Sequence, residues 1–213
     1  MHEYLSVNGA KLSKSTGNAI SPYELADRFG TDAVRWWLLR EVARFGDTDF
    51  TIERLVKRAN GDLANGLGNL QNRTLTLVHK YRAGHIGKPS GATSVATQLV
   101  KAYQALPYLI DEALARFDFR AATDALWSVV EASNQLIETQ RPWELARHEK
   151  QSAQAAAQLD ELLSILAEAC RILAAEAGPF IPTGSSALSK QFRTSDGSIA
   201  PPTPIFTRLQ AKP

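Results

Sequence analysis

The sequence predicts a mainly α-helical fold: a bundle of four or five helices that follows a short extended N-terminal segment. Apolar residues recur at spacings of three and four through most of residues 21–191, as expected for helices with one buried face. Residues 1–20 lack this spacing and carry turn signals instead. A chain of 213 residues, 44% of them hydrophobic, can bury a substantial core, which argues against wholesale disorder.

The N-terminal segment is expected to form a hairpin and then a short helix. Residues 5–7 alternate weakly between apolar and polar, and Asn8-Gly9 is a strong hairpin-turn signal. Ser21-Pro22-Tyr23-Glu24 has the order of a helix start, with a capping hydroxyl, a proline in the first turn and a capping-box glutamate. Gly30 is expected to end this helix.

A second helix is predicted over about 31–44, because apolar residues recur there at helical spacing. Residues 45–49 indicate a turn. Thr51 is a plausible cap for a long third helix that reaches about Tyr81. Three glycines interrupt its apolar pattern and indicate either a break or close packing; they are Gly61, Gly66 and Gly68.

The rest of the chain is predicted as a loop, more helices and a tail. Residues 83–93 are rich in Gly, Pro and Ser and read as a loop. The helices are expected over about 94–116, 119–139, 151–177 and 183–191. Pro107 is expected to kink or split the first of them. From Thr194 onward the composition predicts no regular structure.

Charge and cysteine content narrow the class of protein. A net charge of +2 is too small to identify a nucleic-acid binder, although residues 53–82 carry six basic side chains against two acidic ones. Cys170 is the single cysteine, which excludes an internal disulfide framework and a multi-thiolate zinc site. The sequence contains neither a membrane-spanning apolar run nor a signal-peptide pattern. We therefore expect a cytoplasmic protein with no membrane partner.

Two lysines stand three residues apart on the short segment that follows the hairpin turn. Lys11 and Lys14 flank a hydroxyl residue, so their ammonium groups could reach a polyphosphate. Positive charge of this kind is what phosphoryl chemistry needs, because negative charge develops in its transition state. From lysine spacing alone, an ordinary solvated basic loop is equally consistent.

The long predicted helix carries a polar stripe at spacings of three and four. Its members are Asn65, Asn69, Asn72, Arg73, Thr76 and Lys80. Amide and guanidinium groups can read the base edges of an unstacked RNA loop. The alternative is an ordinary solvated helix face, which the pattern alone favours.

Trp143 lies in a polar junction, directly after Gln140-Arg141-Pro142. Its indole could provide a stacking platform for a base. The alternative is a core tryptophan, because most tryptophans are largely buried. Trp36, Trp37 and Trp127 lie on largely apolar helices and are expected in the core.

The string Lys11-Leu12-Ser13-Lys14-Ser15 resembles the K-M-S-K-S loop of class I aminoacyl-tRNA synthetases, with Leu12 where methionine is usual. Further segments resemble the methionyl-tRNA synthetase family in the same order along the chain; they are residues 7–10, 32–41, 46–50, 65–73, 141–145, 179–182 and 204–206. By contrast, Gly84-His85-Ile86-Gly87 imitates the other class I motif, H-I-G-H, but is followed by Lys88 and lies on the wrong side of the lysine motif.

The resemblance implies roles for specific residues. Lys14 would be the main contact to the ATP phosphates during methionine activation, with Mg²⁺ accompanying the ATP, and Lys11 would be the second catalytic lysine. The ATP-binding set would be Lys11, Ser13, Lys14 and Ser15. Asn69 and Arg73 would contact anticodon bases, and Trp143 would stack on the first of them.

The implied fold is the anticodon-binding helical bundle of class I synthetases, preceded by a short extended remnant of the catalytic domain. We expect residues 1–50 to hold the lysine loop and connecting helices, 51–192 the anticodon-binding bundle and 193–213 a tail. Phosphate contacts are expected from Arg54, Lys57, Arg58 or Lys80.

The implied function is that of the C-terminal part of a methionine–tRNA ligase that binds methionine tRNA. These residues include neither the H-I-G-H half nor the zinc-bearing insertion of the family. We therefore expect no aminoacylation by this chain alone and no zinc site, and a separate catalytic-half chain is a possible partner. Two alternatives stay open: the C-terminal half of another class I synthetase, and a non-catalytic helical protein-interaction module.

Overall fold

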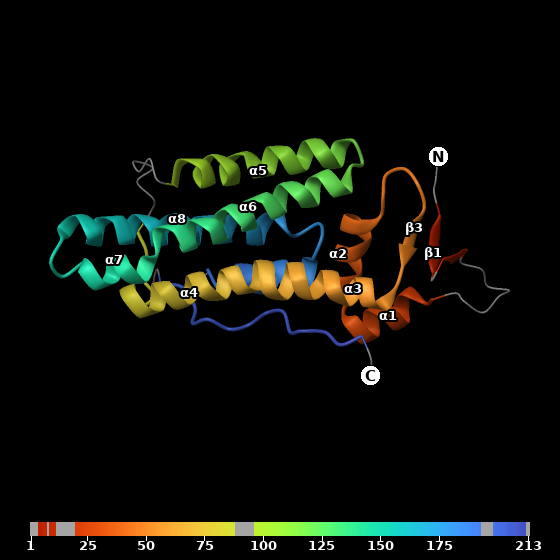
Figure 1. Cartoon of the computed structure of the whole chain (residues 1–213), viewed down its shortest axis with the longest axis horizontal. Coiled ribbons are helices and arrows are strands. Elements are labelled where there is room, and N and C mark those ends of the chain that lie inside the picture. Colours follow the sequence, from red (N-terminus) through yellow and green to blue (C-terminus); the bar gives the residue numbers. More distant parts are fainter. Residues whose placement is uncertain (1–3, 8, 12–19, 88–95, 193–197, 212–213) are drawn as a thin grey trace.

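The computed structural model describes residues 4–7, 9–11, 20–87, 96–192 and 198–211. Figure 1 shows long helices running side by side along the molecule, with a small sheet and two short helices at one end. The predicted mainly helical class is therefore confirmed. Among the described helices, none is both long enough and apolar enough to cross a membrane.

The small sheet contains β1 (Leu5–Val7), β2 (Ala10–Lys11) and β3 (Thr48–Phe50). β1 pairs antiparallel with β2, so the predicted hairpin is confirmed. β1 also pairs in parallel with β3, and the prediction of a simple turn over 45–49 is wrong at its end. The cause is a long-range contact, because the Asp49 carboxylate accepts hydrogen bonds from Ser6 Oγ at 2.7 Å and from the Gly9 N–H at 2.8 Å.

Two short helices follow, α1 (Pro22–Phe29) and α2 (Thr31–Glu41). The Ser21 hydroxyl accepts from the Glu24 N–H at 3.4 Å, and Gly30 ends α1 with a φ of 84°, as predicted. α2 ends three residues before the predicted limit of 44, because Val42 has an extended backbone. Trp36 and Trp37 on α2 are fully buried, which confirms them as core residues.

One continuous rod contains α3 (Ile52–Arg58), the π-helical segment η1 (Ala59–Gly68) and α4 (Asn69–Arg82) (Figure 1). Thr51 caps the rod as predicted, accepting from the Arg54 N–H at 3.2 Å. Two of the three glycines of η1, Gly66 and Gly68, mark close packing. A Cβ on Gly66 would lie 2.2 Å from the ring of Trp127, and one on Gly68 would lie 3.0 Å from the ring of Phe206. Trp127, expected in the core, is only partly buried.

The remaining helices are α5 (Thr97–Ala115), α6 (Phe119–Gln140), α7 (Pro142–His148), α8 (Ala153–Glu176) and α9 (Pro182–Lys190). Pro107 was expected to kink or split this helix; α5 is continuous through it, so the helix is not split there. A proline removes one helical hydrogen bond, whereas Tyr103, Leu106 and Ile110 bury one continuous face of α5 on both sides of it. α7 was not predicted.

The C-terminal segment 198–211 has no regular structure apart from a bridge between Ser198 and His85, in agreement with the prediction. It nevertheless packs along the rod (Figure 1). The Asn60 side chain binds the backbone of Leu209 at both ends, donating to its carbonyl at 2.9 Å and accepting from its N–H at 2.7 Å. The tail is therefore part of the folded body.

Candidate nucleic-acid interface

The predicted polar stripe lies on the solvent-facing side of the rod. Asn65, Asn69, Thr76 and Lys80 are exposed, while Asn72 and Arg73 are partly buried. The opposite side of the rod is buried in the core through Leu67, Leu70 and Val78. Asn72 differs from its neighbours, because its Oδ1 is buried and has no hydrogen bond within the described residues.

Arg73 is held by a carboxylate from a neighbouring helix. Its Nη2 donates to Glu138 Oε1 on α6 at 2.6 Å, and 62% of the Glu138 side chain is exposed. This ion pair joins the middle of α4 to the last turns of α6. Asn69 lies one turn earlier, and its side chain makes no hydrogen bond within the described residues, so its amide is available to a ligand.

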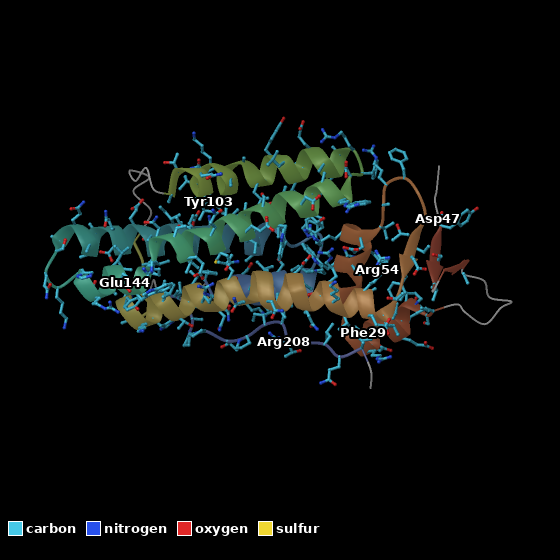
Figure 2. The ribbon with its side chains drawn as sticks, viewed as in Figure 1. Phe29, Asp47, Arg54, Tyr103, Glu144 and Arg208 are labelled. Atoms are coloured by element: carbon cyan, nitrogen blue, oxygen red, sulfur yellow. The ribbon has the colours of Figure 1, made fainter. Side chains whose placement is uncertain are left out.

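Trp143 stands at the start of α7, where the chain reverses after α6. Arg141 adopts a left-handed conformation with a φ of 46°, and Pro142 opens α7. A residue before proline avoids the right-handed helical region, which explains why α6 stops here. Trp143 is partly buried and packs against the main core. Figure 2 shows Glu144, the next residue, at the end of the molecule where α4 also ends.

The cations expected to contact phosphates separate into two groups. Arg54 forms an ion pair with Glu41 at 3.3 Å, and Arg58 pairs with both Glu41 and Asp62. Lys57 and Lys80 are exposed, and neither has a carboxylate partner within the described residues. The two lysines are therefore freer to meet a ligand than the two arginines.

Arg208 adds a cation that sequence reasoning missed. It is exposed on the C-terminal segment, and its Nη2 donates to Asn65 Oδ1 in the stripe at 3.1 Å. Figure 2 labels it beside the rod. The available signal was the segment 204–206, which resembles the family and ends two residues before Arg208.

The lysine loop is described only at its base. Lys11 closes β2, and its side chain is not described, while Ser13, Lys14 and Ser15 lie outside the described residues. The loop starts from a hairpin that Asp49 fixes. The Gly9 N–H, and after it the Ser6 hydroxyl, hold the pKa of the Asp49 carboxyl below its usual range.

Segments that resemble the family meet at a junction between the two ends of the chain. The rings of Trp36 and Phe180 pack edge to face at 6.5 Å. The Asp32 carboxylate accepts from the N–H groups of Thr183 at 3.3 Å and Gly184 at 2.5 Å, and so caps α9 from α2. Within the described part of the chain, no group of three His, Cys, Asp or Glu side chains could hold a metal ion.

Two family models match the chain. The model described as "tRNA synthetases class I (M)" covers residues 1–75, and "Anticodon binding domain of methionyl tRNA ligase" covers residues 88–211. The methionine–tRNA ligase of Caldanaerobacter subterraneus subsp. tengcongensis is 38% identical over 190 residues, which are 89% of this chain and 29% of that protein. The Bacillus subtilis ligase is 37% identical over 209 residues, covering 93% of this chain and 29% of that protein.

Solved structures agree with the family models. Methionyl-tRNA synthetase from Mycobacterium tuberculosis in complex with methionyl-adenylate superposes with a TM-score of 0.87 at 29% identity, covering 96% of this chain and 43% of that one. The apo form of the same enzyme gives a TM-score of 0.83 at 28% identity, covering 90% of this chain and 41% of that one.

The helical bundle and the junction are thus those of a class I aminoacyl-tRNA synthetase. Within that class, the chain belongs to the methionyl-tRNA synthetase family and contains its anticodon-binding domain. The alternative of another class I synthetase is therefore wrong. The chain spans 29% of the length of the curated relatives it matches. The two family models meet between residues 75 and 88. The domain boundaries expected at residues 50 and 192 stay a prediction.

Proposed function

We propose that this chain binds the anticodon of methionine tRNA as part of a methionine–tRNA ligase, through Asn69, Arg73 and Trp143. The observation that carries the proposal is the pairing of Arg73 with exposed Glu138, close in sequence to Trp143, beside the unengaged amide of Asn69. Hydrogen-bonding groups from α4 and an aromatic ring from α7 would thereby meet the same RNA loop. Splayed bases of an RNA loop require both kinds of group.

Each residue would contribute a different interaction. The Asn69 amide can both donate and accept, so it can match the edge of a base. The Arg73 guanidinium presents several donors in a plane, and Glu138 would limit its choice of orientation. Partly buried Trp143 could stack on a base without reordering, because it already packs against the core.

Cations beside the stripe would bind the RNA backbone. Lys57, Lys80 and Arg208 are exposed along the rod and the segment that packs on it. Contacts to phosphates release counterions, so affinity would fall as salt rises. Arg54 and Arg58 would instead hold the protein together through their carboxylate partners.

We further propose that the lysine loop contacts the phosphates of ATP, accompanied by Mg²⁺, during methionine activation and aminoacylation. The family resemblance gives this role to Lys11, Ser13, Lys14 and Ser15. The related M. tuberculosis enzyme has been solved in complex with methionyl-adenylate. When bound, ATP would supply the group that activates the methionine carboxylate. We expect activity only with a catalytic half, whether on the same or on a separate chain.

The residue assignment is tested by measuring the affinity for a methionine-tRNA anticodon stem-loop. Arg73→Ala and Trp143→Ala should each weaken binding about fivefold or more, because each removes an interaction worth roughly 1–3 kcal/mol. Arg171→Ala is the matched control, since Arg171 is also partly exposed and paired with a glutamate, Glu168, but lies on α8 outside the stripe. Equal affinities for all of these variants and the unmodified chain would favour the helical interaction module instead.

A further inference from the structure

The segment of the rod that leads into α4 is wound differently from the helices on either side of it. η1 is π-helical over ten residues, 59–68, and the stripe residue Asn69 follows it directly. A π-helix bonds residue i to i+5, so it turns less per residue than an α-helix with 3.6 residues per turn. The N–H of Asn69 bonds the carbonyl of Ala64, five residues back, as this pattern requires. The lag behind an α-helix accumulates with each residue of such a segment. The winding of η1 thus decides which way Asn69 and Arg73 face.

A buried carboxylate inside η1 ties its winding to α2. Asp62 is 5% exposed. Its Oδ2 accepts from Trp36 Nε1 at 3.0 Å and lies 2.8 Å from Arg40 Nε, too oblique for a hydrogen bond but close enough for an ion pair. Its Oδ1 lies 3.3 Å from Arg58 Nη1, one turn earlier on the rod. Both carboxylate oxygens are therefore engaged.

Arg40 connects the buried Asp62 carboxylate to α6. Its guanidinium carbon lies 5.6 Å from the ring centroid of Trp36 and 5.4 Å from that of Trp127, and its Nη1 lies 3.0 Å from Asp124 Oδ1. Trp127 in turn fills the space beside Gly66, where no Cβ fits. Buried ion pairs are expensive to desolvate, so a well-packed apolar cluster would stabilise the fold at least as well. The contacts of a charged cluster, by contrast, are made in only one geometry, so the cluster restricts η1 to one conformation.

We propose that Asp62 and Arg40 are positioning residues that keep residues 59–68 in the π winding and thereby aim Asn69 and Arg73 at the bases of an RNA loop. Both residues are buried, at 5% and 8% exposure, so they act through the helix and not by touching RNA. This inference rests on the proposed anticodon binding for its consequence, but its structural part, the direction in which α4 faces, can be measured without RNA.

The first test compares two carboxylates that share Arg40. Asp62→Asn should weaken binding of the anticodon stem-loop at least tenfold while the helical circular dichroism is retained, because the charge that holds η1 is gone. Asp124→Asn is the matched control, since Asp124 contacts the same arginine but its side chain is 61% exposed on α6, and affinity should stay within twofold. An equal loss in both variants, or no loss in Asp62→Asn, would overturn the proposal.

The second test measures the direction of α4 directly. In a chain carrying Arg73→Cys and Glu138→Cys, a short bifunctional maleimide should join α4 to α6, since the native side chains meet at 2.6 Å. Cys170 gives little background, because burial raises the pKa of its thiol to about 12. Adding Asp62→Asn should abolish the crosslink, whereas Asp124→Asn should preserve it. An undiminished crosslink with Asp62→Asn would contradict the proposal.

The two readouts separate the two hypotheses. If the unmodified chain does not bind the stem-loop, the proposed function fails and the crosslink alone decides the role of Asp62. If Asp62→Asn does not fold, Arg40→Lys replaces it, because lysine keeps the charge but cannot reproduce both carboxylate contacts and the ring contacts. That variant should lose the crosslink and at least tenfold in affinity, and retention of both would overturn the proposal.

Discussion

Gly66 illustrates how a single residue controls the packing of the rod. Any side chain there would overlap the Trp127 ring, since a Cβ would lie 2.2 Å from it. The sequence placed three glycines in this helix and left open whether they break it or pack closely. The structure shows that the glycines differ. Gly66 packs closely against Trp127, whereas a Cβ on exposed Gly61 would meet nothing within 4 Å.

The two glycines therefore predict opposite outcomes for the same substitution. Gly66→Ala should lower the free energy of unfolding by about 1–3 kcal/mol, because the added methyl forces Trp127 to move. Gly61→Ala should leave it unchanged or raise it by up to about 1 kcal/mol, because alanine restricts the unfolded chain more than glycine does. Urea unfolding of both variants measures the difference, and equal stabilities would contradict the packing described.

At the scale of the secondary-structure elements, the sequence correctly predicted the helix ends that contacts between neighbouring residues stabilise. Ser21, Thr51 and Gly30 marked helix ends correctly, because caps act within three or four residues. The strand β3 was missed because its partners lie 43 residues away in β1. α7 was missed because it is only seven residues long, although Pro142 signalled its start.

The small sheet gives a prediction about pH. Because hydrogen bonds from Gly9 and then Ser6 depress the pKa of Asp49, its ionised form stabilises the fold above the unfolded pKa of about 3.9. That contribution is lost as pH falls through the lower folded pKa. Asp49→Asn should therefore destabilise the chain more at pH 7 than at pH 3.

Urea unfolding at the two pH values measures this difference. Asp27→Asn serves as the control, since Asp27 is exposed on α1 and its side chain makes no hydrogen bond or ion pair within the described residues. The hairpin contact would be refuted by an Asp49→Asn effect that is the same at both pH values.

At the scale of the whole molecule, the candidate site depends on elements distant in sequence. The stripe on α4 was predictable from spacing, but three features were not: the Glu138 partner of Arg73, the partial burial of Trp143 and the position of Arg208. Each depends on how α6, α7 and the C-terminal segment pack against the rod. Tertiary packing of this kind leaves no periodic signal in the sequence.

The distribution of charge over the whole molecule explains why the net charge did not indicate RNA binding. The net charge of +2 averages over exposed lysines and over arginines already paired with carboxylates, such as Arg54 and Arg58. What an RNA backbone would meet is the local set of exposed cations along the rod. Lys57, Lys80 and Arg208 belong to that set.

The most direct test of anticodon recognition compares two RNAs with one protein. The unmodified chain is titrated at fixed salt with a stem-loop that carries the methionine anticodon and with the same stem-loop after one anticodon base is changed. We predict binding of the first to be tighter by about fivefold or more, since a mismatched base contact costs roughly 1–3 kcal/mol. Equal affinity for both stem-loops, or binding of neither, would contradict anticodon recognition by this chain.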